Sequence, residues 1–157
     1  MKKLAILISL GFFIYACGNS GTENSDSNGN NATKTTQEDS QKEDDGKGFG
    51  EIKNVILNDP LDAEMVAAGK NIYEVKCAAC HKLTDQRVVG PGWAGLTKKR
   101  KPEWIMNMTY NPDIMLKEDP VAKELLKECL VIMPNQNLSK GDARDVLEFM
   151  LDNDSKM

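Results

Sequence analysis

The sequence predicts an all-α domain, and three observations support this prediction. Apolar residues recur at intervals of three and four in several segments between residues 59 and 151, which is the spacing of one helix face. Proline and acidic residues stand where these segments begin. No segment shows the sustained alternation of apolar and polar residues that is typical of a half-buried strand. We therefore expect four to five short helices in one domain that spans residues 51–157.

The first predicted helix runs from about Asp62 to Lys76. Pro60 is compatible with a first turn, and the carboxylates of Asp62 and Glu64 would complement the positive end of the helix dipole. The apolar face of this helix is expected to contain Met65, Ala68, Ile72, Tyr73 and Val75.

The second predicted helix begins near Pro102, because proline is favoured in the first turn of a helix. It is preceded by a loop, which the Gly-Pro-Gly group at 90–92 indicates. Asn111-Pro112 is expected to end the helix, since the residue before a proline is disfavoured in the α conformation.

Two further helices complete the predicted domain. The third spans residues 120–129, where apolar residues stand three and four positions apart. The last begins at Ser139, and Asp142 three residues later forms a partial capping box with it. This helix would direct Val146 and Leu147 toward the core.

Residues 1–16 are predicted to be an export signal outside the folded domain. Lys2 and Lys3 precede an apolar run that is too short to span a bilayer. The run ends in Ile14-Tyr15-Ala16-Cys17, which resembles the lipobox of bacterial lipoproteins, where the chain is cut before the cysteine and that cysteine is acylated. We expect Cys17 to be the lipidated first residue of the mature chain. The alternative is an ordinary secretory signal with an incidental cysteine.

Residues 17–50 are predicted to form a disordered tether between the lipid anchor and the domain. The stretch is rich in Gly, Asn, Ser, Asp and Glu, and it cannot bury enough apolar surface to offset its chain entropy. Acidic residues outnumber basic ones there, whereas the domain mixes both charges almost evenly. This balance gives no indication of nucleic-acid binding.

The stretch Cys77-Ala78-Ala79-Cys80-His81 is the strongest functional signal in the chain. It is a C-x-x-C-H motif, and it contains the protein's only histidine. Two thiols at this spacing can add to the two vinyl groups of a haem, and the imidazole can then bind the iron. One such motif predicts one covalent haem c, and haem is joined to this motif outside the bacterial cytoplasm, in agreement with the export signal.

Two other interpretations of the cysteines are weaker. A thioredoxin-like redox motif needs a preceding strand, but the approach to Cys77 is predicted to be helical. A structural zinc site would combine Cys77, Cys80, His81 and Cys129, but adjacent ligands at Cys80 and His81 do not match the usual spacing of such sites. Cys129 is more simply explained as a buried apolar side chain.

A second axial ligand for the iron must be a methionine, because no second histidine exists. Met133 is the first candidate. It precedes Pro134 in a loop, where an extended backbone can project the thioether toward a buried metal. Met115 is the alternative, and the remaining internal methionines fall in predicted helices, where core packing explains them. The basic cluster at 98–101 is expected to be a solvated loop, or else to contact an acidic partner or the haem propionates.

From residue 61 to 151 the chain resembles class I c-type cytochromes, which have C-x-x-C-H near the start, a Gly-Pro loop after it, and Met-Pro ahead of the last helix. The resemblance implies the class I cytochrome c fold. It also implies that Cys77 and Cys80 form the thioethers, that His81 and Met133 are the axial ligands, and that the Pro91 carbonyl accepts a hydrogen bond from the His81 ring.

The same resemblance predicts a contact between the first and last helices. Gly69 falls where the family crosses these helices, and Tyr73 is expected to pack against Phe149. The stretch 111–120 is also similar to small monohaem domains of bacterial respiratory and nitrogen-oxide-reducing chains.

Coordination of the iron on both faces predicts an electron carrier, not an enzyme, because no position is left for a substrate. A dihaem peroxidase would carry two C-x-x-C-H motifs, and a gas sensor would have to exchange Met133 for a small ligand. We therefore expect a monomeric monohaem cytochrome that is lipid-anchored on the periplasmic side of a bacterial membrane. Its expected partners are membrane lipid, bound through Cys17, and respiratory or nitrogen-oxide-reducing redox proteins.

Overall fold

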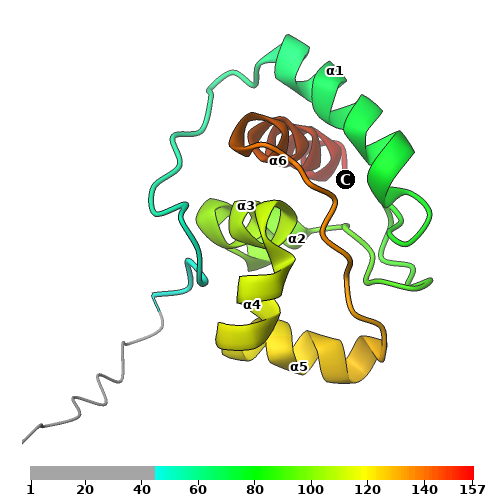
Figure 1. The fold of residues 1–157 in the computed structure, drawn as a ribbon. Coiled ribbons are helices and arrows are strands. Elements are labelled where there is room, and N and C mark those ends of the chain that lie inside the picture. The colour runs from blue at the N-terminus through cyan, green and yellow to red at the C-terminus, as the bar shows by residue number, and fades with distance from the viewer. Residues whose placement is uncertain (1–44) are drawn as a thin grey trace, which may run out of the picture. The chain divides into compact units, whose positions relative to one another are not determined.

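A computed structural model describes residues 45–157. The predicted export signal, Cys17 and residues 17–44 of the predicted tether lie outside the described residues. The described part folds into α1 (Ala63–Ile72), the π-helical turn η1 (Tyr73–Cys77), α2 (Leu96–Lys99), α3 (Pro102–Tyr110), α4 (Pro112–Glu118), α5 (Pro120–Cys129) and α6 (Lys140–Ser155) (Figure 1). Within residues 45–157 the only β-type pairing outside the helices is an isolated bridge between His81 and Arg87, so the all-α prediction is confirmed.

The described residues contain two short helices that the sequence patterns did not predict, α2 and α4. Asn111-Pro112 ends α3 as expected, but it also begins α4. The Asn111 side chain accepts a hydrogen bond from the Ile114 N–H at 3.4 Å, and Pro112 occupies the first helical position. Asparagine at the cap and proline directly after it are both favoured at a helix start, so one dipeptide serves both elements.

The predicted starts of the first and last helices are present. Asp62 caps α1 by accepting hydrogen bonds from the Glu64 and Met65 N–H groups, and Pro60 lies outside the helix. At α6, Ser139 Oγ accepts from the Asp142 N–H at 3.1 Å, and Asp142 Oδ2 accepts from the Ser139 N–H at 2.8 Å. The capping box is therefore complete.

The first predicted helix changes its winding at Tyr73. The Ala78 N–H donates to the Tyr73 carbonyl at 2.9 Å, which is the five-residue spacing of a π turn. The wider turn rotates the side chains out of the α-helical register. Val75 is therefore 83% exposed, so its predicted place on the apolar face is wrong, while Cys77 turns inward and is buried.

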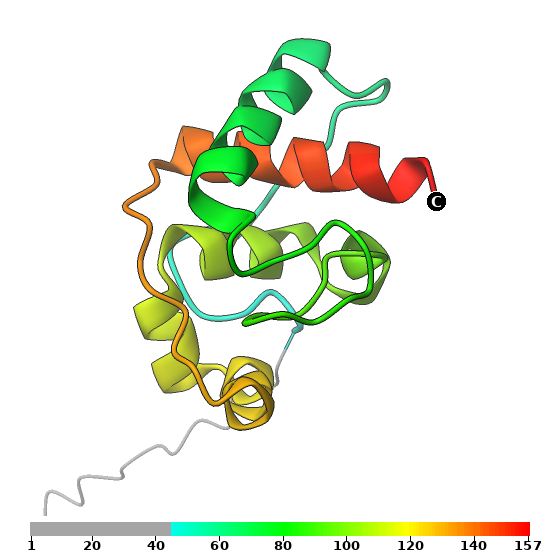
Figure 2. The same ribbon diagram turned by 90° about the vertical axis from the view of Figure 1, so that its right-hand side faces the viewer.

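The helices α1 and α6 cross in close contact, as predicted (Figure 2). A Cβ atom at Gly69 would lie 2.0 Å from the Asp145 carbonyl oxygen and 2.9 Å from Phe149 Cβ. The Tyr73 and Phe149 rings pack with their centroids 5.5 Å apart. Glycine at position 69 is what allows the two backbones to approach this closely.

The substitution Gly69→Ala is expected to lower the free energy of unfolding by about 2 kcal/mol, because the new methyl group meets backbone, which cannot move aside as a side chain can. Urea unfolding followed by circular dichroism measures the change. Gly141→Ala is the matched control, since its Cβ would meet Ser139 Oγ at an ordinary 3.5 Å. Equal stability of the two variants would contradict the close crossing.

Residues 45–58, which we call the N-terminal strap, lie against the helical domain. The Phe49 N–H donates to Met115 Sδ at 3.1 Å. The buried Asn107 side chain accepts from the Ile52 N–H at 3.1 Å and donates to the Ile52 carbonyl at 2.9 Å. Residues 45–50 were expected in the tether and instead pack on the domain, so the described fold begins before residue 51.

The glycines of the strap explain this difference. Gly48 has a φ of +73°, and a Cβ atom there would lie 2.7 Å from Met115 Cε and 3.0 Å from the Trp104 ring. Glycine thus permits close packing at a position where composition alone indicates disorder. Within residues 45–157, no helix has both the length and the apolar character needed to cross a membrane.

Candidate haem site

An apolar cavity that opens to solvent lies between the C-x-x-C-H segment and the loop that joins α5 to α6. The sides of this cavity are formed by the segment 76–93, by residues of α3, α4 and α5, by the loop 131–138 and by Met150 of α6. Far more apolar than polar surface faces the space. An apolar ligand is therefore the kind of group that this cavity fits.

The C-x-x-C-H segment forms a tight turn directly after η1. The N–H groups of Cys80 and His81 both donate to the Cys77 carbonyl, at 3.0 and 2.9 Å. All three side chains line the cavity. Burial raises the pKa of the Cys77 thiol to about 11, so the site favours an uncharged sulfur, and a thioether is uncharged.

The His81 ring is held in one orientation. Its Nδ1 lies 2.8 Å from the Pro91 carbonyl oxygen, as the resemblance to class I cytochromes implied. A carbonyl can only accept, so Nδ1 carries the proton and the lone pair of Nε2 is left for a metal. Burial lowers the pKa of His81, which keeps the imidazole neutral. A Cβ atom at Gly90 would lie 2.4 Å from His81 Cε1, so this ring position requires glycine there.

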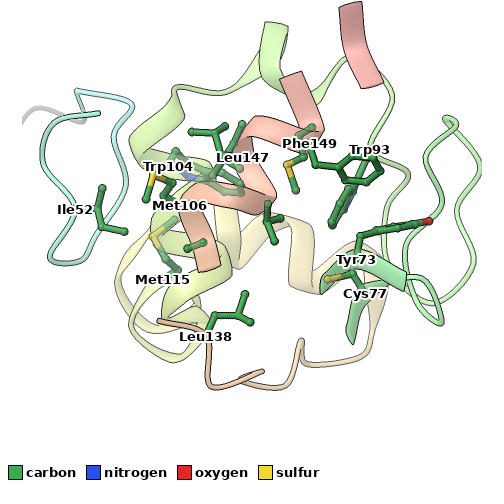
Figure 3. Close-up of a cluster of buried hydrophobic side chains, with 14 of the residues drawn as sticks. Ile52, Tyr73, Cys77, Trp93, Trp104, Met106, Met115, Leu138, Leu147 and Phe149 are labelled. Atoms are coloured by element: carbon green, nitrogen blue, oxygen red, sulfur yellow. The ribbon is translucent and has the colours of Figure 1, made fainter. Parts of the chain in front are cut away.

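Trp93, which was not predicted from the sequence, also packs beside the His81 ring. Its ring centroid lies 5.7 Å from that of His81 and 4.9 Å from that of Tyr73. The Tyr73 hydroxyl donates to the His81 carbonyl at 2.9 Å. Trp93, Tyr73 and Cys77 lie at the same end of the buried cluster (Figure 3). Its place directly after the Gly90-Pro91-Gly92 loop is the sequence feature that could have indicated a role for Trp93 beside His81.

A buried carboxylate anchors the loop that follows Trp93. Asp154 near the end of α6 accepts from the Gly95 N–H at 2.8 Å, from the Thr97 N–H at 2.9 Å and from the Thr97 hydroxyl at 2.6 Å. The loop that carries Pro91 is thereby fixed to α6, which is the longest helix among the described residues.

The two candidate methionines lie in different surroundings. Met133 lines the cavity from the loop between α5 and α6. Met115 is fully buried under the N-terminal strap, where Sδ accepts the Phe49 N–H, and it is not among the lining residues. Met108 and Met150 also line the cavity, but both are carried by helices and pack in or against the core cluster. Of the three methionines that line the cavity, Met133 is therefore the one that is carried by a loop and not by a helix.

The alternative sites do not form among residues 45–157. No three His, Cys, Asp or Glu side chains there gather as they would around a metal ion, so the Cys₃His set with Cys129 is not assembled. Cys129 is partly buried and lines the cavity at the end of α5. In the basic cluster, Lys98 and Lys99 are exposed, whereas the Arg100 guanidinium lies over the Trp104 ring at 5.3 Å.

The residues present fit a covalently bound haem. Two thiols on one turn, an imidazole with a free Nε2 and a loop thioether all line one apolar cavity. Gly90 leaves the space in which the imidazole sits. Thiols, an imidazole and a thioether are softer ligands than the carboxylate and carbonyl oxygens that bind magnesium or calcium.

Comparisons with known proteins agree with this chemistry. The family model described as Cytochrome c matches residues 66–154. The structure of a cytochrome c from Rhodothermus marinus is similar with a TM-score of 0.68 and 34% identity, over 71% of this chain and 96% of that one. An engineered form of that protein, Rma TDE, has a TM-score of 0.66 and 34% identity, over 70% and 95% of the two chains.

A third similar structure is the same engineered Rhodothermus marinus cytochrome c bound to a carbene intermediate, with a TM-score of 0.63, 34% identity, and coverage of 70% and 95% of the two chains. No match was found among curated proteins.

Proposed function

Because the chain belongs to the cytochrome c family, we propose that it is a membrane-tethered monohaem carrier that transfers single electrons between respiratory-chain partners outside the cytoplasm. It is an electron-carrying cytochrome with one covalently bound haem c and an all-α class I cytochrome c fold. The tethering, the partners and the roles of individual residues are the parts that we propose.

Each residue of the site has a distinct task in this proposal. Cys77 and Cys80 would hold the haem through thioethers, and the Nε2 of His81 and the thioether sulfur of Met133 would bind its iron. The haem, when bound, supplies a reversible one-electron couple between Fe(II) and Fe(III). The hydrogen bond to Pro91 orients the imidazole and increases its basicity, and the apolar lining keeps water from the site.

One observation carries this proposal. The apolar cavity has an imidazole on one of its lining segments and a loop methionine on another, which supports the proposal that this chain itself supplies both ligands of the iron. An iron with both axial positions filled exchanges electrons and has no position for a substrate, and thioether ligation raises its potential. An enzymatic role is not part of the proposal.

The mouth of the cavity is the surface that we propose for redox partners. Five exposed apolar residues belong to two of the segments that line the cavity or adjoin them in the chain, and each is 40% exposed or more: Val88, Val89, Leu130, Val131 and Ile132. Three of them, Val89, Val131 and Ile132, also line the cavity. Apolar residues grouped on a surface are typical of binding sites, and the short-lived complexes of electron transfer bury small areas.

The membrane tether rests on the sequence. Cys17 ends the lipobox-like run, and the polar stretch that follows it reaches the strap at residue 45. A flexible chain of this length has a root-mean-square reach of about 30 Å, so a lipid at Cys17 would keep the domain at high effective concentration near membrane-bound partners. The domain's mixed charge gives no reason to propose nucleic acid as a partner, and we propose that it is monomeric.

The Cys17→Ala variant is expected to move the protein from the membrane fraction to the soluble fraction, because it removes the residue that would be acylated. Deletion of residues 22–44 should leave the absorption spectrum and potential of the haem unchanged and slow electron flow in intact membranes. The deletion stops before Asp45 so that the strap remains intact. A Cys17→Ala protein that stays membrane-bound after its signal is removed, or undiminished flux with the short tether, would contradict the model.

A further inference from the structure

The end of α5, directly before the loop that carries Met133, receives a contact from Arg87, which lies in the loop after His81. Arg87 Nη2 donates to Glu128 Oε2 at 2.8 Å, and Nη1 donates to the Glu128 carbonyl at 3.2 Å. Glu128 lies in the last turn of α5, where carbonyl groups lack partners within the helix. A guanidinium there satisfies one carbonyl and complements the negative end of the helix dipole.

A second contact reaches the loop itself, on the far side of Met133. Lys76 Nζ, in η1, donates to the Gln136 carbonyl at 2.9 Å. Glu128 precedes Met133 in the chain and Gln136 follows it, so the two contacts lie on either side of the methionine. Both donors belong to the segment 76–87 that contains the C-x-x-C-H motif. We call these two contacts the polar clamps.

Little else fixes this loop. Among the described residues, no backbone-to-backbone hydrogen bond outside the helices involves residues 131–137. Asn135 Nδ2 donates to Asp113 Oδ2 at 3.3 Å, and the other hydrogen bonds of the stretch are local. Val131 and Ile132 are mostly exposed and contribute little burial. The position of Met133 therefore depends on side chains that reach it from other segments.

We propose that Arg87 and Lys76 are positioning residues that hold the Met133 loop closed over the cavity, so that the thioether stays on the iron. This inference rests on the proposed role of Met133. Each clamp is solvent-exposed and contributes little to global unfolding. Opening of the loop alone breaks few other contacts, so the same small contribution is a large share of the free energy that keeps the loop closed.

The test is the rate at which imidazole replaces the methionine in the oxidised, haem-loaded protein, since this exchange requires the loop to open. Arg87→Ala and Lys76→Ala should each accelerate it about three- to tenfold, the range expected for one exposed ion pair or hydrogen bond. The double variant should show the product of the two factors, because both clamps break in one opening event. The far-red band without imidazole should be unchanged in all three variants.

Matched controls separate this role from general stability. Lys127→Ala removes an ion pair that lies within α5, and Lys70→Ala removes one between Lys70 and Glu74. Neither contact reaches the Met133 loop, so both variants should exchange imidazole at the wild-type rate. Because a clamp is broken in the unfolded chain as well as in the open loop, Arg87→Ala and Lys76→Ala should raise the global unfolding constant by about the factor by which they raise the exchange rate. Any loss of stability in Lys127→Ala and Lys70→Ala should leave the exchange rate unchanged.

Two results would overturn the inference while leaving the proposed ligand intact. The first is wild-type exchange in Arg87→Ala and Lys76→Ala, and the second is an equal acceleration of exchange in the controls Lys127→Ala and Lys70→Ala. Loss of the far-red band in Met133→Ala in the same series would show that the proposed ligation stands. Retention of the band in Met133→Ala would instead reject both the ligand and the clamps that serve it.

Discussion

Replacement of Met133 by alanine is expected to abolish the weak far-red band of the oxidised protein and to let carbon monoxide bind the reduced protein. The variant removes the one lining methionine that lies on a loop. Met115 cannot take its place, because its sulfur is buried and accepts the Phe49 N–H. Absorption spectra before and after addition of carbon monoxide measure both effects.

The substitution Met133→His provides the complementary test. It should keep both axial positions filled, so carbon monoxide binding stays slow, while the reduction potential falls by an amount on the order of 0.1 V or more, because imidazole stabilises Fe(III) better than a thioether does. Met115→Ala and Met108→Ala serve as controls and should retain the band. A band that survives in Met133→Ala and disappears in either control would assign the ligand elsewhere.

The double substitution Cys77→Ala, Cys80→Ala is expected to release the haem completely when the chain is denatured. Each single variant should retain one thioether, so its haem stays attached. A denaturing gel stained for haem-linked peroxidase activity reads the covalent bond directly, and the result does not depend on whether the variants fold.

The third cysteine of the cavity supplies the control for attachment. Cys129 lines the same space but lies outside the C-x-x-C-H turn, so Cys129→Ala should stain as strongly as the wild type. An unstained wild-type band would refute covalent attachment. Loss of stain in Cys129→Ala would show that the motif is not the attachment site.

The parts of the structure that the sequence predicted correctly depend on local chemistry. The capping box at Ser139 needs only residues within one turn, and the site turn at 77–81 is contiguous. The helix crossing at Gly69 is the exception, because it was predicted from the resemblance to a family and not from the spacing of residues. Fold class and the position of the haem turn could therefore be predicted from the amino-acid sequence alone.

The parts that could not be predicted depend on contacts between distant segments. Asn111-Pro112 was interpreted as a helix end, although the same two residues also suit a helix start. The contact from Arg87 to Glu128 spans 41 positions, and no local pattern indicates it. Residues 45–50 of the strap were assigned to the tether because their glycines resemble a disordered composition, whereas in the fold these glycines lie close to side chains of α3, of its cap and of α4.

The N-terminal strap has a mechanical consequence. A force applied to the chain at Asp45 would pass first to the Lys101 ammonium and then to the hydrogen bonds that Asn107 makes with the strap. Neither Lys101 nor Asn107 lines the haem cavity. The strap would thus transmit a force on the proposed membrane tether to α3 and its cap, and the proposed iron ligands, His81 and Met133, would not bear it.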